Sequence, residues 1–65
     1  MNDNFLTPAE KRVFTLVLEG LSNQEIAEKL NVSVNTVKTH VARILKKNSV
    51  KNRRELILKS LKSIR

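Results

Sequence analysis

Capping signals divide this chain of 65 residues into short helices. In a capping box, an N-cap hydroxyl accepts from a backbone N–H three residues later, and a Glu there accepts from the N-cap N–H. Thr7 and Glu10 have this spacing around Pro8, a residue that favours the first helical position, and Ser22 and Glu25 repeat it. The sequence therefore predicts helices that begin at residues 8 and 23.

Two further starts follow in the second half of the chain. Asn52 and Glu55 form a third capping signal, with Asn as the cap. Ser33 caps another segment, although Thr36 stands where a capping box has Glu. These signals predict helices that begin at residues 53 and 34.

The predicted helix ends are marked by residues that tolerate the left-handed conformation. Gly20 and Asn31 follow the first two helical segments, and both residue types are suited to a left-handed cap. Asn48 is predicted to take the same conformation after the third segment.

The apolar spacing between these marks is helical, and no segment alternates with the period of a strand. The fold class is therefore predicted to be all-α, a single four-helix domain over residues 1–65 with helices at about 8–19, 23–30, 34–47 and 53–64. The side chains expected in the core are Phe5, Val13, Phe14, Leu16, Val17, Leu18, Ile26, Ala27, Leu30, Val37, Val41, Ile44, Leu45, Leu56, Ile57, Leu61 and Ile64.

Charge is strongly polarised along the chain. The formal net charge is +7, and residues 33–65 hold ten basic side chains against one acidic side chain. Such a distribution suits a polyanion on one side of the molecule, with nucleic acid as the first candidate and an anionic membrane surface as the second.

Composition excludes several other classes. The chain has no Cys and one His, so we expect no metal site and no cofactor. A lone His40 without a nucleophile supports no catalytic site, and we expect that the chain is not an enzyme. His40 is expected to be either a hydrogen-bonded packing residue or a DNA contact. No apolar run approaches the length of a membrane span, so the expected location is the cytoplasm, with the bacterial nucleoid.

The second and third predicted helices form a helix-turn-helix over residues 23–47. The outward face of the third helix carries cations and short polar groups with no acid among them: Asn35, Lys38, Thr39, Ala42, Arg43 and Lys46. A recognition helix needs this combination, because its centre approaches base edges while its flanks meet phosphates.

The sequence resembles the DNA-binding domain of the LuxR/GerE family. The matching runs are LTPAE at 6–10, GLSNQEIA at 20–27, VSVNTVKTHV at 32–41 and VKNRR at 50–54. The resemblance covers residues 5–64 and implies a four-helix domain that binds double-stranded DNA, usually as a dimer on inverted repeats, and regulates transcription.

The resemblance also implies roles for individual residues. Base contacts in the major groove are expected from Asn35, Lys38, Thr39, Ala42 and Arg43. Phosphate contacts are expected from Ser22, Asn23, Gln24, Thr36, Lys46, Lys47, Arg53 and Arg54.

The fourth helix carries the dimer contact in this family, and here the chain departs from the family pattern. Leu56 stands where the family often has a small residue, and Asn48 and Ser49 replace a Leu-Gly pair. Leu58 and Lys62 are the candidate dimer contacts; Leu58 belongs either to a flank of the core or to a weak dimer patch.

Two other functions fit parts of the sequence. Region four of bacterial sigma factors has a similar helix-turn-helix and binds RNA polymerase as well as promoter DNA. A membrane-active cationic peptide would explain the basic second half, although the capping boxes favour a folded domain. Nothing in the chain fits a receiver or a small-molecule-binding domain, which leaves a standalone regulator or the DNA-binding part of a larger one.

Overall fold

The computed structural model describes residues 5–63, with the side chain of Ser63 excepted, and contains four α-helices and no strand over that range. The helices are α1 (Pro8–Leu18), α2 (Asn23–Leu30), α3 (Val34–Lys47) and α4 (Arg53–Ser63). All four predicted starts are confirmed. The first helix ends one residue earlier than predicted, because Glu19 is its C-cap, and the predicted end of the fourth at residue 64 lies outside the described residues.

Both predicted capping boxes are present. The backbone N–H of Glu10 donates to the Thr7 hydroxyl at 3.1 Å, and Oε1 of Glu10 accepts from the Thr7 N–H at 2.9 Å. The Ser22 and Glu25 pair repeats this exchange at 3.1 and 2.7 Å. Each box satisfies backbone donors that a helix start otherwise leaves without a partner, which fixes where α1 and α2 begin.

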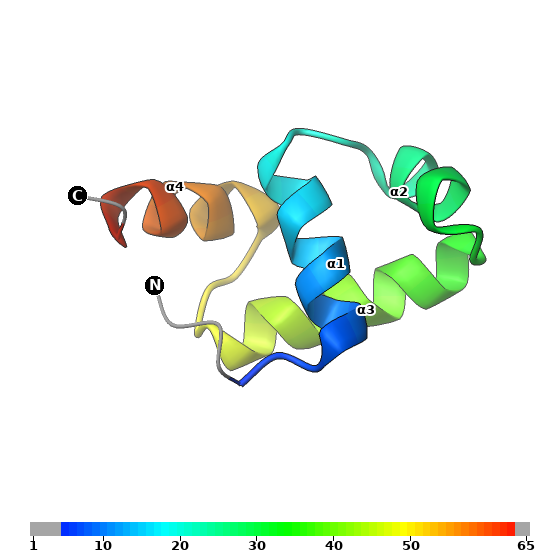
Figure 1. The fold of residues 1–65 in the computed structure, drawn as a ribbon. Helices are drawn as coiled ribbons and strands as arrows, with labels where there is room; N and C mark the ends of the chain where they lie inside the picture. The colour runs from blue at the N-terminus through cyan, green and yellow to red at the C-terminus, as the bar shows by residue number, and fades with distance from the viewer. Residues whose placement is uncertain (1–4, 64–65) are drawn as a thin grey trace.

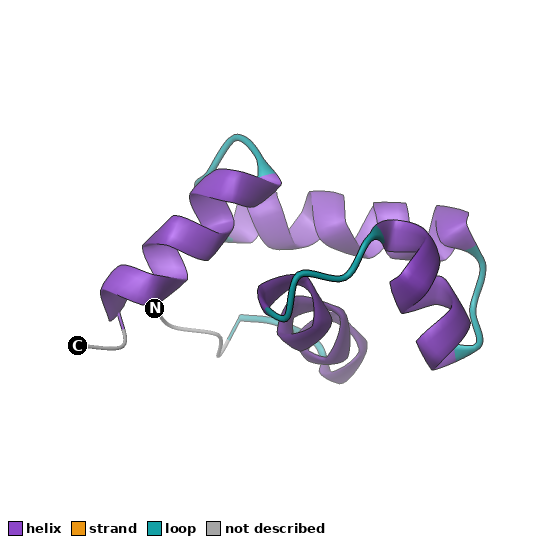
Figure 2. Ribbon diagram, turned by 90° about the horizontal axis from the view of Figure 1, so that it is seen from above, coloured by secondary structure: helices purple, strands orange, loops and turns teal. Residues whose placement is uncertain are grey.

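Helix α3 is the longest element, and the other helices pack around it. Figure 1 and Figure 2 show α2 beside the N-terminal half of α3, α4 near its C-terminal end, and α1 crossing between them. Helix α1 contacts all three other helices, whereas α4 packs on α1 and α3. The helix-turn-helix is therefore held from behind by α1 and from one end by α4.

The core lies where these helices meet. Its buried apolar side chains are Leu6, Val13, Phe14, Leu16, Val17, Ile26, Ala27, Val37, Val41, Ile44 and Leu56. Leu56, which stands where the family often has a small residue, is completely buried, so the core accommodates this larger side chain.

The prediction of a core position is wrong for three residues. Phe5 precedes α1 and is 67% exposed, because the chain reaches the core only at Leu6. Leu18 at the end of α1 is also exposed. Leu61 is 58% exposed, since α4 buries Leu56 and Ser60 instead; Ile64 lies outside the described residues.

The corner between α3 and α4 differs from the prediction. Asn48 has φ −98°, and Ser49 is the left-handed residue, with φ 57°. Asn48 is buried and its side-chain amide donates to the Ile44 carbonyl at 2.9 Å, while its own carbonyl accepts from Nζ of Lys59 at 2.7 Å. Hydrogen bonds of Asn48 therefore stabilise the corner between α3 and α4. Gly20 and Asn31 take the predicted left-handed conformation.

Candidate nucleic-acid interface

One face of α3 is exposed along its length. This recognition strip consists of six exposed side chains: Asn35, Lys38, Thr39, Ala42, Arg43 and Lys46. The opposite face holds Val37, Val41 and Ile44, which are buried against the other helices. The helical period therefore separates the two faces as predicted, and packing fixes the direction in which the strip points.

The size and chemistry of the strip suit a groove in duplex DNA. An α-helix with its side chains is about 10–12 Å across, which matches the roughly 12 Å width of a B-form major groove. The 14 residues of α3 make it about 21 Å long. The Thr39 hydroxyl donates to the Asn35 carbonyl at 3.1 Å, which leaves the Thr39 methyl group available for an apolar contact. Ala42, one turn later, is also small. The short side chains at the centre of the strip therefore allow the helix to approach base edges closely.

The N-terminus of α3 is capped by hydroxyl groups and contains no acid. The Ser33 hydroxyl accepts from the backbone N–H of Thr36 at 3.0 Å and shares a hydrogen bond with the Thr36 hydroxyl at 2.9 Å. The first turn of α3 has no acidic side chain. A phosphate beside Thr36 would therefore meet the positive end of a helix without a carboxylate to repel it.

The N-terminus of α2 is a second candidate place for a phosphate, although its first turn contains the Glu25 carboxylate, which accepts from the Ser22 N–H. Ser22 is the N-cap, and the N–H groups of the first helical turn, which includes Asn23 and Gln24, lack intrahelical acceptors. Ser22 and Gln24 are exposed and Asn23 is half-buried. The three residues predicted here from the sequence therefore occupy one exposed helix start.

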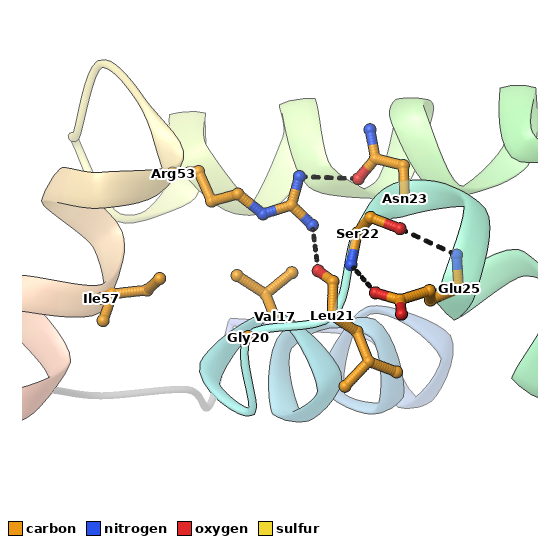
Figure 3. A pocket seen from close by; sticks show the side chains of 8 residues that line it. All are labelled: Val17, Gly20, Leu21, Ser22, Asn23, Glu25, Arg53 and Ile57. Carbon is orange, nitrogen blue, oxygen red and sulfur yellow. Dashed lines mark hydrogen bonds between the residues drawn. The ribbon is translucent and has the colours of Figure 1, made fainter.

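Arg53 reaches this helix start from α4. Its Nη1 donates to Oδ1 of Asn23 at 2.7 Å, and its Nη2 donates to the Leu21 carbonyl at 3.2 Å. Figure 3 shows the guanidinium between these two acceptors, at the edge of an open pocket that Val17, Gly20 and Ile57 also line. Arg53 thus has partners inside the molecule, which the sequence did not indicate.

Lys47 also has internal partners. Its Nζ donates to Oε1 of Glu10 at 2.7 Å and to the Phe5 carbonyl at 3.1 Å. Glu10 is 1% exposed, so its charge is neutralised by this ion pair. The Lys47 hydrogen bond, the Thr7 backbone N–H and the positive charge of Lys47 and His40 hold the pKa of Glu10 below its ordinary value, against the opposing effect of burial.

The remaining predicted residues lie on the surface. Lys46 and Arg54 are exposed, and their side chains have no hydrogen bond or ion pair within the described part of the chain. Leu58 is 51% exposed and Lys62 is exposed one helical turn away, with exposed Leu61 between them. Leu58 is therefore not a flank of the core.

His40 lies away from the recognition strip. It is half-buried and lines a small pocket between α1 and the helix-turn-helix, together with Ala9 and Val32. Its Nδ1 is buried without a hydrogen-bond partner in the described structure. This position agrees with a packing role for His40, but the described structure lacks the hydrogen bond that was expected to accompany it.

Within residues 5–63, no three His, Cys, Asp or Glu side chains are grouped so that they could hold a metal ion. Among the helices described, none is both long and apolar enough to cross a membrane.

The sequence matches a family of bacterial regulatory proteins and several individual transcriptional regulators. The family described as "Bacterial regulatory proteins, luxR family" matches residues 4–60. A probable transcriptional regulator, ycf29, of Porphyra purpurea is 42% identical over 59 residues, which is 91% of this chain and 28% of the relative. The monoamine regulon transcriptional regulator of Klebsiella aerogenes is 46% identical over 52 residues, 80% of this chain and 23% of the relative.

A third relative is the nitrate/nitrite response regulator NarL of Escherichia coli, 44% identical over 52 residues, 80% of this chain and 24% of the relative. The chain thus spans about a quarter of the length of the curated relatives it matches.

Proposed function

The chain belongs to the luxR family of bacterial regulatory proteins, and from that membership we propose that it binds duplex DNA in a sequence-specific manner and regulates transcription, in the cytoplasm at the nucleoid. The observation that carries the proposal is the recognition strip. It is basic and polar, free of acid, and lies opposite the buried face of α3.

The centre of the strip is proposed to read bases. Lys38 would donate to the O6 and N7 atoms of guanine, and the methyl groups of Thr39 and Ala42 would contact a thymine methyl. Asn35 can pair with adenine and Arg43 with guanine at either side of this centre. These are the residue types whose side chains match the edges that each base pair presents in the major groove.

Phosphates on either side of the groove are proposed to set the position of α3. Ser22, Asn23 and Gln24 would bind one phosphate through the N-terminus of α2, and Thr36 would bind another at the start of α3. Lys46 and Arg54 are proposed to neutralise phosphates directly, because their side chains are exposed and unpaired in the described structure. Lys47 and Arg53, the other two expected phosphate contacts, are already hydrogen-bonded within the domain. We assign Lys47 to stabilising the fold.

Dimer formation is proposed to use α4. Leu58 and Leu61 are large apolar side chains on adjacent turns, both more than half exposed, and Lys62 lies beside them. A second copy could cover this pair. The patch is small, so the expected dimer is weak in the absence of DNA and is favoured on an operator that holds two copies side by side.

Selection of bound duplexes from a random pool tests this function. At about 0.15 M salt, non-specific phosphate binding is weakened, and enrichment reports base recognition. An inverted repeat with half-sites about one helical turn apart is the expected product of a dimeric regulator. Enrichment of a single half-site would support sequence-specific DNA binding and contradict the dimer. If no sequence is enriched and the protein captures RNA polymerase in the absence of DNA, the proposal is replaced by a role like that of sigma-factor region four.

A further inference from the structure

Arg53 links the first turn of α4 to the first turn of α2. Both hydrogen bonds of its guanidinium end within three residues of the chain, at the Leu21 carbonyl and at the Asn23 side chain. Helix α4 otherwise packs on α1 and α3. Arg53 is half-buried and lines the open pocket together with Val17 and Ile57.

The shorter of the two hydrogen bonds fixes how the Asn23 amide is turned. A carboxamide has one oxygen that accepts and one nitrogen that donates, and a guanidinium can only donate. Because Oδ1 of Asn23 accepts from Nη1 of Arg53 at 2.7 Å, Nδ2 must lie on the other side of the amide. In Figure 3 this nitrogen points away from Arg53 and away from the pocket.

This orientation matters because Asn23 stands at a helix start that is proposed to bind phosphate. With Nδ2 turned away from Arg53, the amide can add a donor to the N–H groups of the first turn of α2, which also contains the Glu25 carboxylate. If the amide were turned the other way, its oxygen would face the phosphate and repel it. The second bond of Arg53 engages the Leu21 carbonyl, another acceptor next to the same helix start.

We propose that Arg53 is a positioning residue for DNA binding, which acts through Asn23 by holding Nδ2 of the amide toward a DNA phosphate. This inference rests on the proposed function and assigns Arg53 a role different from that of its neighbour. Arg54 has the same charge and is exposed, with no side-chain partner in the described structure, so it is suited to contact phosphate directly.

A double-mutant cycle separates the two roles. The variants are Arg53→Met, which keeps an apolar stem over the pocket, Asn23→Ala, and the pair combined, each measured for affinity to a duplex selected with the wild-type protein. Arg53→Met and Asn23→Ala should each weaken binding by about 3–10-fold, the range expected for one hydrogen bond. The combined variant should bind the duplex as tightly as Asn23→Ala alone, because Arg53 acts only through Asn23.

Arg54→Met is the matched control, because it removes the same charge one residue away. It should lower the slope of log affinity against log salt by about one unit, and Arg53→Met by clearly less. Additive losses in the cycle, or equal slope losses for the two Arg variants, would show that Arg53 contacts phosphate itself and would overturn the inference.

The side-chain amide resonance of Asn23 gives a test that needs no variant. In the wild-type protein its ¹⁵N–¹H signals should shift on addition of the selected duplex, and signals that stay unmoved contradict the inference. Where Arg53→Met remains folded by circular dichroism, the shift should be lost or much reduced. If the wild-type protein binds no duplex, the proposed function itself is wrong. This result is distinct from one that contradicts only the role of Arg53.

Discussion

Nζ of Lys47 lies 2.7 Å from Oε1 of Glu10, so the last turn of α3 is joined to the capping box that begins α1. The same nitrogen donates to the Phe5 carbonyl. One lysine therefore ties the C-terminal end of α3 to the segment that leads into α1. The carboxylate is buried and depends on this partner for its charge balance.

Lys47→Met should destabilise the domain with little effect on the salt dependence of DNA binding. Loss of the ion pair leaves a buried carboxylate with only a backbone partner. The free energy of unfolding should fall by about 1–2 kcal/mol, a range discounted because the Lys47 side chain is 35% exposed. Urea unfolding followed by circular dichroism measures this change.

Lys46→Met serves as the comparison for Lys47→Met. Its side chain is exposed and unpaired in the described structure, so stability should change by less than about 0.5 kcal/mol. DNA binding should weaken on all sequences alike, with a loss of about one unit of salt slope. The assignment of Lys47 would be wrong if the two variants exchanged these behaviours.

Stability should fall in acid because of Glu10. Its pKa in the folded protein is lowered, first by the Lys47 hydrogen bond, so the stabilisation is complete above the ordinary Glu pKa of about 4.3. It is lost as the pH falls further, through the lowered pKa of the folded state. Thermal unfolding between pH 7 and pH 2 should show this loss, and Glu10→Gln should be less stable at pH 7 and flatter across the acid range.

Ser49→Gly should stabilise the corner between α3 and α4. Ser49 has φ 57°, a conformation in which a side chain is strained and glycine is not. Relief of that strain, less the greater freedom of glycine in the unfolded chain, should raise the free energy of unfolding by about 0.5–1 kcal/mol. The midpoint of thermal unfolding should then rise by roughly 2–8 °C for a domain of this size.

Gly20→Ala is the opposite experiment. Gly20 has φ 91°, and a Cβ built there would meet no atom within 4 Å, so any cost comes from the backbone alone. The midpoint should fall by several degrees, because the left-handed conformation disfavours alanine. If the midpoint is unchanged in both variants, a side chain causes no strain at either left-handed position.

Leu58→Lys and Leu61→Lys should shift the monomer–dimer equilibrium toward monomer. Both side chains are exposed, so the fold should tolerate the charge, while two like charges would face each other across a symmetric interface. Sedimentation equilibrium on protein alone and on a two-site duplex measures the change. Unaltered association in both variants would remove α4 from the dimer proposal.

The helices could be predicted because their starts are encoded locally. Thr7 with Glu10 and Ser22 with Glu25 specify capping boxes within four residues, and the structure contains both. The face of α3 that points outward follows from the spacing of Val37, Val41 and Ile44. Each of these features depends on one segment of the chain and on the period of the helix.

The exposed face of α4 and the partners of two cations could not be predicted in this way. Leu61 has the spacing of a buried residue, but α4 meets the core along Leu56 and Ser60, which depends on how three helices are placed. Lys47 and Arg53 carry the sequence signature of phosphate ligands. Their side-chain partners, Glu10 and Asn23, lie 37 and 30 residues away, so only the assembled fold shows that both cations are hydrogen-bonded within the domain.

Selection of duplexes with the Lys38→Ala variant tests the central claim, that the exposed face of α3 reads bases. Against the wild-type protein under the same salt, the variant should keep the rest of the selected site and lose preference at one or two adjacent base pairs, with a cost of about 1–3 kcal/mol on the original duplex. The same preference at every position, in both proteins, would contradict the claim that Lys38 and its face of α3 enter the major groove.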